Sequence, residues 1–313
     1  MISVKIFVIG GANLDIYAKV NKDRVVLYDS NPSHISFSYG GVARNIVENI
    51  ANMQAKPYFI SVFGNDAMGL QMYNDLKKKG VNLDYSLIDE QRTTSSYLAV
   101  LDADDMYVAC SDMSLIEDMK VEQLEKLKPI IDANDFVVFD ANLSINIINY
   151  ICNSLKGIKV FDAISTTKVT KINDLLDKID VVKLNKLEAE ALSLKKIENE
   201  SDIKDIAISL HNKGLKKSLI SWGSKLFVCE RSKVIKYEHF GLRENPVNVT
   251  GAGDSLIGNY VYALSKGQNE DDAVAFGLSA AILTVDVMSA VRDLTKEMII
   301  KNIKTLNIQK GEL

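Results

Sequence analysis

The hydrophobic positions of this chain form short apolar runs, separated by longer segments in which apolar residues recur every three or four positions. The short runs are rich in Val, Ile and Phe, as is typical of buried strands, and they cover residues 5–9, 58–63, 136–140, 159–162, 181–184 and 217–221. The periodic segments predict helices over 43–53, 69–79, 121–127, 145–155, 201–213, 271–287 and 294–303. This alternation predicts a largely parallel sheet with helices on both faces and a ligand crevice at the carboxyl ends of the strands.

Two segments, 15–38 and 93–110, break this alternation. Polar and apolar residues alternate along both of them, turns interrupt them, and no helical period is present. They predict antiparallel strands that stand off the main sheet as a small lid beside the crevice. No Pro-rich or Gly-rich linker divides the chain, so we expect a single domain over 1–313 in which about 15–38 and 93–112 form the lid.

Composition and charge narrow the class of protein. The 313 residues are 47% hydrophobic and 25% charged, which is ordinary for a globular protein and argues against disorder. The net charge of −4 gives no electrostatic footprint for nucleic acid or an anionic membrane. No stretch approaches the ~20 apolar residues of a membrane span, and the first apolar run has the length of a strand, not of a signal peptide. We therefore expect neither nucleic acid nor a membrane as a partner.

Cysteines and histidines are few. Three cysteines lie far apart without a Cys-x-x-Cys pair, so we expect a reducing, cytoplasmic compartment and neither a disulfide framework nor a zinc site. The histidines are His34, His211 and His239, and none has the spacing of a metal ligand. We interpret each as a surface or core residue, and histidine-based catalysis is not predicted.

The segment at 247–254, Val-Asn-Val-Thr-Gly-Ala-Gly-Asp, carries the strongest chemical signal. Residues Thr250 to Gly253 have little side-chain bulk, so their N–H groups can approach a ligand closely. A helical segment, 255–264, follows, and the N-terminus of a helix favours phosphate or another anion. Asp254 adds a carboxylate that can take a proton from a hydroxyl, and the combination indicates phosphoryl transfer to an alcohol. The alternative is a tight turn in which Asp254 only complements the helix dipole.

A first pair of glycines, Gly10 and Gly11, follows the first predicted strand. Beyond it, Asn13 and Asp15 project polar side chains at alternate positions. A carboxylate at the mouth of a crevice can accept hydrogen bonds from a pair of sugar hydroxyls. The alternative is a glycine turn with Asp15 in solvent.

A second pair, Gly40 and Gly41, opens the helix that runs to residue 53. Asn45 lies in the first turn of that helix and faces back toward the glycines, where it could bind a hydroxyl. Alternatively, Asn45 is an ordinary residue of a helix start and Arg44 is a solvated surface charge.

Asn185 and Glu188 come directly after the strand predicted over 181–184. Their spacing of three places both on one side of a helical turn. Both are hard oxygen donors, which suit the waters of a hydrated Mg²⁺ ion. The alternative is a capping box, in which Asn185 caps the helix and Glu188 reaches back.

Taken together and in this order, the motifs resemble those of the PfkB (ribokinase-like) family of sugar and nucleoside kinases. The two signature regions of the family correspond to 40–45 with its helix and to 248–254, and the Asn-x-x-Glu motif lies between them. The resemblance extends from Gly10 to the C-terminal helices. It implies an α/β fold, namely a three-layer α/β/α sandwich with a mostly parallel central sheet and a small β-sheet lid. It also implies ATP as phosphoryl donor and Mg²⁺ as cofactor.

Within the family, the chain is most similar to the pseudouridine kinases. The segments that carry this similarity are 28–35 running into 40–49, 94–98, 111–113 and 248–250. The similarity implies phosphorylation of the ribose 5′-hydroxyl of pseudouridine. Another kinase of the family, acting on ribose, inosine, adenosine or a ketose such as fructose, is the alternative. A nucleoside-binding regulator without catalysis is a hypothesis from another class.

The resemblance implies roles for individual residues on the phosphate side. Those expected around the transferring phosphoryl group are Gly251, Ala252, Gly253 and Asp254, with Asp254 as the base. Those expected to bind the nucleotide are Asn185, Ser221, Gly223, Thr250, Gly251 and Gly253. Those expected to hold Mg²⁺, mostly through water, are Asn185 and Glu188.

The resemblance also implies a set of substrate-binding residues. They are Asn13, Asp15, Ser30, Gly41, Asn45, Ser96, Asp112 and Lys168. Of these, Ser30, Ser96 and Asp112 are expected on the lid side of a nucleoside pocket. A homodimer through the lid is a further expectation.

Two positions depart from the family pattern. Leu226 stands where the second glycine of a Gly-x-x-Gly loop is usual, which leaves the conformation of the nucleotide loop and the nucleotide preference open. Asn248 replaces an Asp, and Ser289 with Ala290 replaces a common Gly-Ala. A monovalent cation such as K⁺ therefore stays an open possibility.

Overall fold

A computed structural model describes residues 4–103, 106–240, 249–286 and 289–313. Asn248 of the second signature and Val287 at the end of a predicted helix lie outside the described residues. Along the described parts of the chain, no helix is both long enough and apolar enough to cross a membrane.

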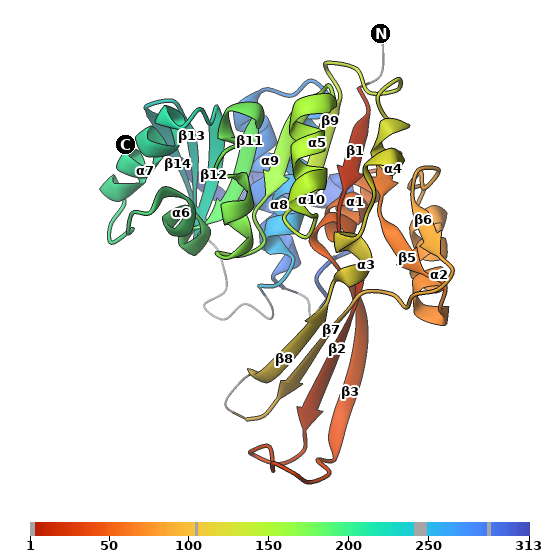
Figure 1. The fold of residues 1–313 in the computed structure, drawn as a ribbon. Coiled ribbons are helices and arrows are strands. Elements are labelled where there is room, and N and C mark those ends of the chain that lie inside the picture. The colour runs from red at the N-terminus through yellow and green to blue at the C-terminus, as the bar shows by residue number, and fades with distance from the viewer. Residues whose placement is uncertain (1–3, 104–105, 241–248, 287–288) are drawn as a thin grey trace.

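A nine-stranded sheet forms the centre of the molecule (Figure 1). Its strands, in spatial order, are β15 (Asn307–Glu312), β14 (Lys233–Phe240), β13 (Lys225–Glu230), β12 (Lys217–Trp222), β11 (Val181–Asn185), β10 (Ile158–Asp162), β9 (Phe136–Asp140), β1 (Ile6–Ile9) and β4 (Tyr58–Ile60). The strands from β12 to β4 pair in parallel. The strands β12 to β15 pair antiparallel. The expected mostly parallel sheet is confirmed, with an antiparallel edge that the sequence pattern did not predict.

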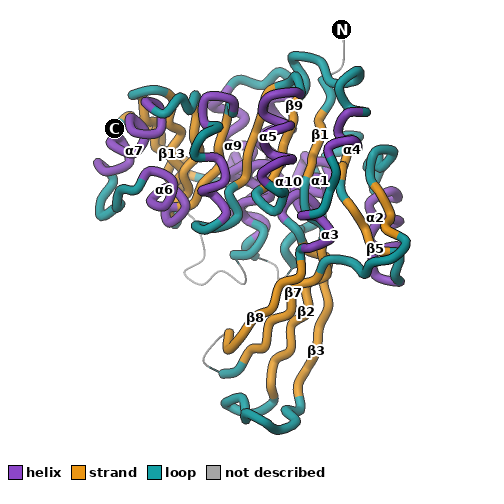
Figure 2. Tube along the Cα trace, viewed as in Figure 1, coloured by secondary structure: helices purple, strands orange, loops and turns teal. Residues whose placement is uncertain are grey.

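Helices cover both faces of this sheet and complete a three-layer sandwich (Figure 2). One face carries α1 (Val42–Asn52), α8 (Ala252–Ser265), α9 (Glu270–Thr284) and α10 (Lys296–Thr305), with α2 (Ala67–Lys78) beside the β4 edge. The other face carries α3 (Ser114–Glu117), α4 (Val121–Glu125), α5 (Ile145–Ser154), α6 (Lys186–Ser193), α7 (Ser201–Asn212) and the short 3₁₀ helices η1 (Lys168–Ile172) and η2 (Leu176–Lys178).

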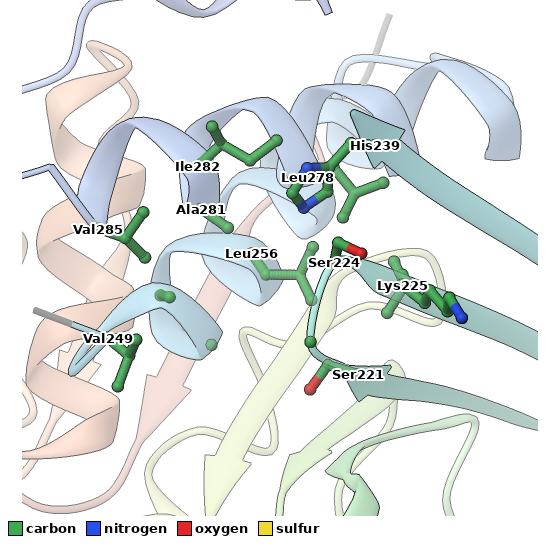
Figure 3. A pocket seen from close by; sticks show the side chains of 14 residues that line it. Ser221, Ser224, Lys225, His239, Val249, Leu256, Leu278, Ala281, Ile282 and Val285 are labelled. Carbon is green, nitrogen blue, oxygen red and sulfur yellow. The ribbon is translucent and has the colours of Figure 1, made fainter. Parts of the chain in front are cut away.

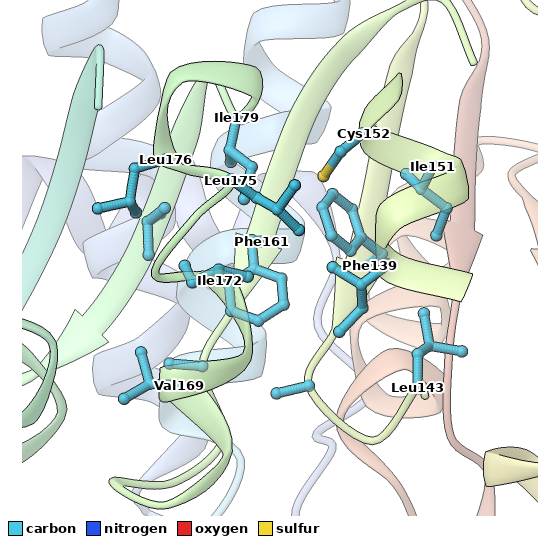
Figure 4. Close-up of a cluster of buried hydrophobic side chains, with 14 of the residues drawn as sticks. Phe139, Leu143, Ile151, Cys152, Phe161, Val169, Ile172, Leu175, Leu176 and Ile179 are labelled. Carbon is cyan, nitrogen blue, oxygen red and sulfur yellow. The ribbon is translucent and has the colours of Figure 1, made fainter. Parts of the chain in front are cut away.

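The strands are apolar throughout because both of their faces are buried. Val138 belongs to the core under α1 and α8, whereas its neighbour Phe139 belongs to the core under α5 and η1. On that second side, the rings of Phe139 and Phe161 lie 5.2 Å apart between their strands and the covering helices (Figure 4). Alternate side chains therefore fill two separate cores, which explains why the sequence shows continuous apolar runs and not a polar alternation.

A separate four-stranded sheet forms the lid, which extends away from the body (Figure 1). Its strands, in spatial order, are β3 (Ser33–Gly40), β2 (Asn13–Val20), β7 (Ser96–Leu101) and β8 (Met106–Asp112). The outer pairs are antiparallel, as expected, but β2 and β7 pair in parallel. The expectation of a wholly antiparallel lid is therefore wrong, because both inner strands start at the body and run outward.

The predicted strand over 58–63 is divided at Ser61. The first half, β4, pairs with β1, whereas β5 (Val62–Gly64) leaves the large sheet and pairs with β6 (Leu87–Asp89). At the break, the Ser61 hydroxyl donates to the carbonyl of Gly10 at 2.7 Å. This hydrogen bond links the end of β4 to the turn at Gly10 and Gly11.

Candidate active site

The N-terminus of α8 is shaped by Gly251, which adopts φ 81 as the N-cap. A side chain at this position would collide with the carbonyl of Ala290. Both the left-handed backbone and the close approach therefore require glycine here. The predicted helix start is confirmed. The Ala252 N–H donates to the Val249 carbonyl at 3.3 Å, whereas the N–H groups of Gly253 and Asp254 have no intrahelical acceptors and can bind an anion.

Asp254 is buried in the first turn of α8, with 7% of its surface exposed. Its Oδ2 accepts a hydrogen bond from Asn45 Nδ2 at 2.9 Å. Burial, reinforced by the nearby charge of Asp162, raises the pKa of Asp254 to about 7, against the lowering effects of Lys183 and Asn45. A carboxylate at the start of a helix is expected to ionise readily, but here desolvation outweighs the effect of the helix dipole on the pKa of Asp254.

Asn45 reaches Asp254 because α1 and α8 cross closely. Gly258 lies one turn beyond Asp254, and a Cβ at this glycine would be 3.0 Å from the carbonyl of Ile46. The absence of a side chain lets the two helices approach at this point. The sequence predicted that Asn45 faces back toward Gly40 and Gly41, and its contact with Asp254 of the second signature was not predicted.

Arg44 is buried and orients Asn45. Its Nη1 donates to Asn45 Oδ1 at 3.0 Å and to the carbonyl of Tyr39 at 3.1 Å. The guanidinium also forms an ion pair with Glu48, which lies one turn along α1. The alternative of a solvated Arg44 is therefore wrong, and the amide of Asn45 is held with its nitrogen toward Asp254.

Three charged side chains missed by the sequence analysis form a row across the sheet. Asp140, Asp162 and Lys183 are register partners on β9, β10 and β11, so their side chains share one face. All three are buried, and Lys183 Nζ lies 3.3 Å from Asp162 Oδ2. The available signal was a carboxylate at the end of an apolar strand for Asp140 and Asp162, and a charged residue inside an apolar strand for Lys183.

Lys183 brings a cation to the N-terminus of α8. A Cβ at Gly253 would lie 2.5 Å from its Nζ, so the glycine makes room for the ammonium group. Although burial alone would lower it, the pKa of Lys183 is raised by the charges of Asp162, Glu188 and Asp254. The ammonium therefore stays charged beside the anion-binding turn.

Asp140 joins the two glycine motifs. Its Oδ2 accepts from the N–H groups of Gly11 and Ala43 at 3.1 and 3.0 Å, and its Oδ1 accepts from Asn142 N–H at 2.9 Å. Gly41 caps α1 with φ 99, close to the Gly11 carbonyl. The turn after β1 and the start of α1 are therefore held together, as their predicted common role in substrate binding requires.

Asn13 and Asp15 lie at the root of the lid and face this junction. Asn13 Nδ2 donates to Asp15 Oδ1 at 2.6 Å, and the Asp15 carboxylate packs directly against Gly40. Burial raises the pKa of Asp15 to about 6, although Asn13 and Arg44 act to lower it. The structure brings Asn13, Asp15, Gly41 and Asn45 together, as the sequence predicted.

Lys168 contacts this group only through Asn142. Its Nζ donates to Asn142 Oδ1 at 2.6 Å. The other end of that amide faces the first glycine turn, since a Cβ at Gly11 would lie 2.8 Å from Asn142 Nδ2. Lys168 is thus on the substrate side of the crevice, and Asn142 is a polar neighbour that the sequence analysis missed.

The lid residues Ser96 and Asp112 lie on the wrong face. Asp15 is the register partner of Tyr97, and Tyr97 is the partner of Ser111, so these three share one face. Ser96 and Asp112 pair with each other and project from the opposite face. Ser96 and Asp112 therefore do not share the face of Asp15, whereas their neighbours Tyr97 and Ser111 do.

Ser30 is remote from the other predicted substrate residues. It lies in the exposed loop beyond the far end of the β2–β3 hairpin, where Val20 pairs with Ser33. Strand rise of about 3.3 Å per residue separates this loop from Asn13 by roughly 25 Å. Within one chain, the structure does not bring Ser30 to the site.

Asn185 and Glu188 form the capping box that was the alternative interpretation of their spacing. Asn185 Oδ1 accepts from Glu188 N–H at 2.9 Å, and Glu188 Oε2 accepts from Asn185 N–H at 2.8 Å. Burial raises the pKa of Glu188, and the charge of Lys183 opposes this. Among the residues described, no three His, Cys, Asp or Glu side chains cluster to form a direct metal site. A hydrated ion bound through water remains compatible with the oxygen donors.

A cavity of about 400 Å³ adjoins the N-terminus of α8 and includes Gly253 (Figure 3). Ser221 and Gly223, which were predicted to line the nucleotide site, lie in its wall. Leu226 fills the place of the usual glycine with a buried side chain that also lines the cavity. The apolar side chains around it are Leu226, Leu256, Leu278, Ala281, Ile282 and Val285. Thr250 lies outside this wall, next to Gly251.

Comparison with known proteins places this geometry in a family. Residues 3–297 match the sequence pattern described as pfkB family carbohydrate kinase. The chain is 31% identical to pseudouridine kinase from Escherichia coli (strain K12), covering 90% of this chain and 91% of that protein. It is 26% identical to ribokinase from Haemophilus influenzae, covering 87% and 92%. The structure of Arabidopsis thaliana ribokinase complexed with ribose and ATP matches with a TM-score of 0.84 at 22% identity, covering 97% and 99%. The chain therefore belongs to the pfkB family of carbohydrate kinases, which are phosphotransferases with an alcohol group as acceptor.

Proposed function

We propose that this kinase transfers the γ-phosphoryl group of ATP to the ribose 5′-hydroxyl of pseudouridine. The observation that carries the phosphoryl transfer is the buried Asp254 carboxylate at the glycine-rich start of α8, held by Asn45. The choice of pseudouridine rests on the 31% identity with the Escherichia coli enzyme over nearly the whole chain. ATP as donor is supported by the solved ribokinase that contains it.

In the proposed reaction, Asp254 takes the proton of the 5′-hydroxyl as its oxygen attacks the γ-phosphorus. The bond from the γ-phosphorus to the β–γ bridging oxygen breaks, and ADP leaves. Backbone N–H groups of Gly253 and Asp254 and the Lys183 ammonium stabilise the charge on the transferring group. A pKa of about 7 suits Asp254 to accept a proton near neutral pH.

On the substrate side, Asn13, Asp15 and Asn45 would bind the ribose hydroxyls. Tyr97, on the same lid face as Asp15, forms an edge-to-face pair with Tyr17 at 6.5 Å between ring centroids. This aromatic surface suits a nucleobase, which stacks on such rings, and a free sugar would leave it uncovered.

The family also implies Mg²⁺, which neutralises phosphate charge when bound. Glu188 and Asn185 would hold it through water, since Glu188 has a second carboxylate oxygen outside the capping box and the single amide oxygen of Asn185 has a second lone pair. The excess of buried carboxylates over cations around Lys183 also suits a divalent cation.

The test is a panel of acceptors supplied with ATP and Mg²⁺, followed by phosphorus NMR of the product. We expect kcat/KM for pseudouridine to exceed that for uridine, inosine, adenosine, ribose and fructose by at least about 100-fold. Uridine is the matched control, because it has the same base atoms with a different glycosidic bond. Faster turnover of ribose than of pseudouridine would contradict the proposed substrate. If no acceptor of the panel were phosphorylated by ATP, only the family assignment would stand.

A variant of the aromatic surface adds a second test. Tyr97→Ala should raise KM for pseudouridine about tenfold, because one stacking surface contributes roughly 1–1.5 kcal/mol. It should leave any residual turnover of ribose unchanged. Equal effects on both substrates would show that Tyr97 acts on the lid fold and not on the base.

A further inference from the structure

His239 is a buried polar side chain in the wall of the otherwise largely apolar cavity next to α8. It lies near the end of β14 and is 6% exposed (Figure 3). Much of the wall is formed by apolar residues of α8 and α9, including Leu256, Leu278 and Ile282. Apolar walls of this kind suit a nucleobase, and Gly253 of the anion-binding turn lines the same cavity.

The ring of His239 has no hydrogen-bond partner within the part of the chain that the structure describes. Its Nδ1 is fully enclosed and unpaired. Its backbone N–H, by contrast, donates to the Ser224 carbonyl at 3.2 Å. A buried, unsatisfied polar group costs about 1–3 kcal/mol. Because Nδ1 is enclosed, a ligand in the cavity would bind the other ring nitrogen, Nε2, and the cost at Nδ1 is one that the fold bears to keep the ring in this wall.

The imidazole of His239 is expected to be neutral, and a neutral ring suits an uncharged partner. Burial lowers the pKa of His239, and only the charge of Glu238 opposes this. Glu238 is itself engaged by Lys225 and Lys236, at 3.8 and 3.1 Å. A neutral imidazole offers one N–H donor and one acceptor, which matches the mixed donors and acceptors along the edge of a nucleobase.

The other polar side chains of this wall are less suited to this role. Lys225 Nζ pairs with Glu200 at 2.5 Å, and the Ser221 hydroxyl donates to the Leu184 carbonyl at 3.4 Å. Ser224 lies in the tight turn between β12 and β13. The imidazole therefore combines burial, an open hydrogen-bonding capacity and a place among the apolar walls.

We propose that His239 is the residue by which this kinase recognises the base of its nucleotide, through a hydrogen bond to the polar edge of that base. The inference rests on the proposed function, because it assigns the base of the phosphoryl donor to this cavity. His239 is a specificity-determining residue in this role, and it takes no part in the transfer of the phosphoryl group.

The experiment measures nucleotide binding without an acceptor. Trp222 is the single tryptophan of the chain and precedes Gly223 in the cavity wall, so its fluorescence can report binding of ADP, GDP and CDP. We expect His239→Phe, which keeps the flat ring and removes the hydrogen bond, to raise Kd for ADP at least tenfold. The ratio of Kd values between ADP and CDP should change at least threefold. His239→Gln, which restores a donor and an acceptor, should recover most of the affinity, and Ser224→Ala is the matched control.

The outcomes separate this inference from the proposed function. If the unmodified protein binds none of the three nucleotides, the proposed function fails and this inference fails with it. If the unmodified protein binds ADP but His239→Phe binds it equally well, only this inference fails. A uniform weakening of all three nucleotides, with a lower melting temperature, would also overturn it, because His239 would then act only through the fold. At saturating ATP, we expect kcat of His239→Phe to stay within twofold of the unmodified enzyme.

Discussion

The carboxylate of Asp254 is positioned to act as a base, because it is buried beside the anion-binding turn and bound by Asn45. Asp254→Asn keeps the shape of the side chain and removes its capacity to accept a proton. We expect kcat to fall by about 10²–10⁴, the usual contribution of general-base catalysis. In the unmodified enzyme, kcat/KM should rise with pH and level off above about 7, where Asp254 becomes ionised. Turnover of Asp254→Asn within tenfold of the unmodified enzyme would contradict this role.

The burial of Asp254 that raises its pKa also makes the stability of the folded protein depend on pH. The pKa of Asp254 is raised from 3.8 to about 7, so between these values the folded chain keeps a proton that the unfolded chain has lost. The stability due to this group is therefore full below about pH 4 and is lost as the pH rises to about 7. Asp254→Asn is neutral throughout, so we expect its melting temperature to exceed that of the unmodified protein by several degrees at pH 8 and by less at pH 5. Calorimetry at both pH values checks this, and equal shifts would contradict it.

Lys183 is predicted to set both the rate and its pH dependence. Its charge lowers the pKa of Asp254, so Lys183→Met should move the midpoint of the kcat/KM profile to higher pH. It should also reduce kcat at least about 100-fold, because one cation beside the transferring group is lost. Lys217 lies on β12, next to the strand of Lys183, and pairs with Glu270 of α9. Lys217→Met is therefore the matched control and should leave the profile unchanged. A lower kcat with an unmoved midpoint would show that Lys183 does not act on Asp254.

Sequence reasoning singled out residues that stand next to glycine pairs. Asn13, Asp15 and Asn45 were chosen because a pair of glycines beside a polar side chain is typical of a turn that approaches a ligand closely. Asp162 ends an apolar strand and Lys183 lies within the next one, and both were missed because only the register of the sheet shows that they are adjacent. Which residues become neighbours across a sheet depends on the order of the strands, and no local pattern in one sequence encodes that order.

At the scale of elements, the Asn185–Glu188 motif at the start of α6 has two proposed roles, which are to cap the helix and to hold the waters of Mg²⁺. Glu188→Gln preserves the reciprocal bond of the capping box but removes the charge. Burial disfavours the charge of Glu188 and Lys183 favours it, so the two effects oppose each other and we expect the free energy of unfolding to change by about 1 kcal/mol or less. If Glu188 also holds the waters of Mg²⁺, the Mg²⁺ concentration for half-maximal rate should rise about tenfold. An unchanged Mg²⁺ requirement would leave Glu188 as a helix cap only.

The elements themselves were predictable where burial is simple. The strands of the parallel part of the sheet and most helices match the expected ranges within a few residues, because two-sided burial and amphipathic periods are local signals. The errors concern pairing. The strand over 58–63 was not expected to change sheets at Ser61, and β2 was not expected to pair in parallel with β7. In the lid, a shift of one residue reversed the facing of Ser96 and Asp112, since alternate residues point to opposite faces.

At the scale of the whole molecule, the two faces of the lid differ in chemistry. The face that carries Asp15 and Tyr97 also carries Asn13 at the root of the lid. The opposite face carries apolar side chains that are strongly exposed, with Ile35 at 54%, Phe37 at 56% and Val108 at 46%. A contiguous exposed apolar surface on a soluble domain marks an interaction site.

We predict that this apolar face pairs with the same face of a second copy, so that the protein is a dimer at micromolar concentration. Phe37→Glu should produce a monomer, because pairing would bury a charge in each protomer without a partner. Ser36→Glu adds the same charge on the neighbouring position of β3 but projects from the other face, so it should remain dimeric. Sedimentation velocity distinguishes the two species. A monomeric unmodified protein, or equal dissociation of both variants, would contradict the prediction, since neither result depends on the apolar face.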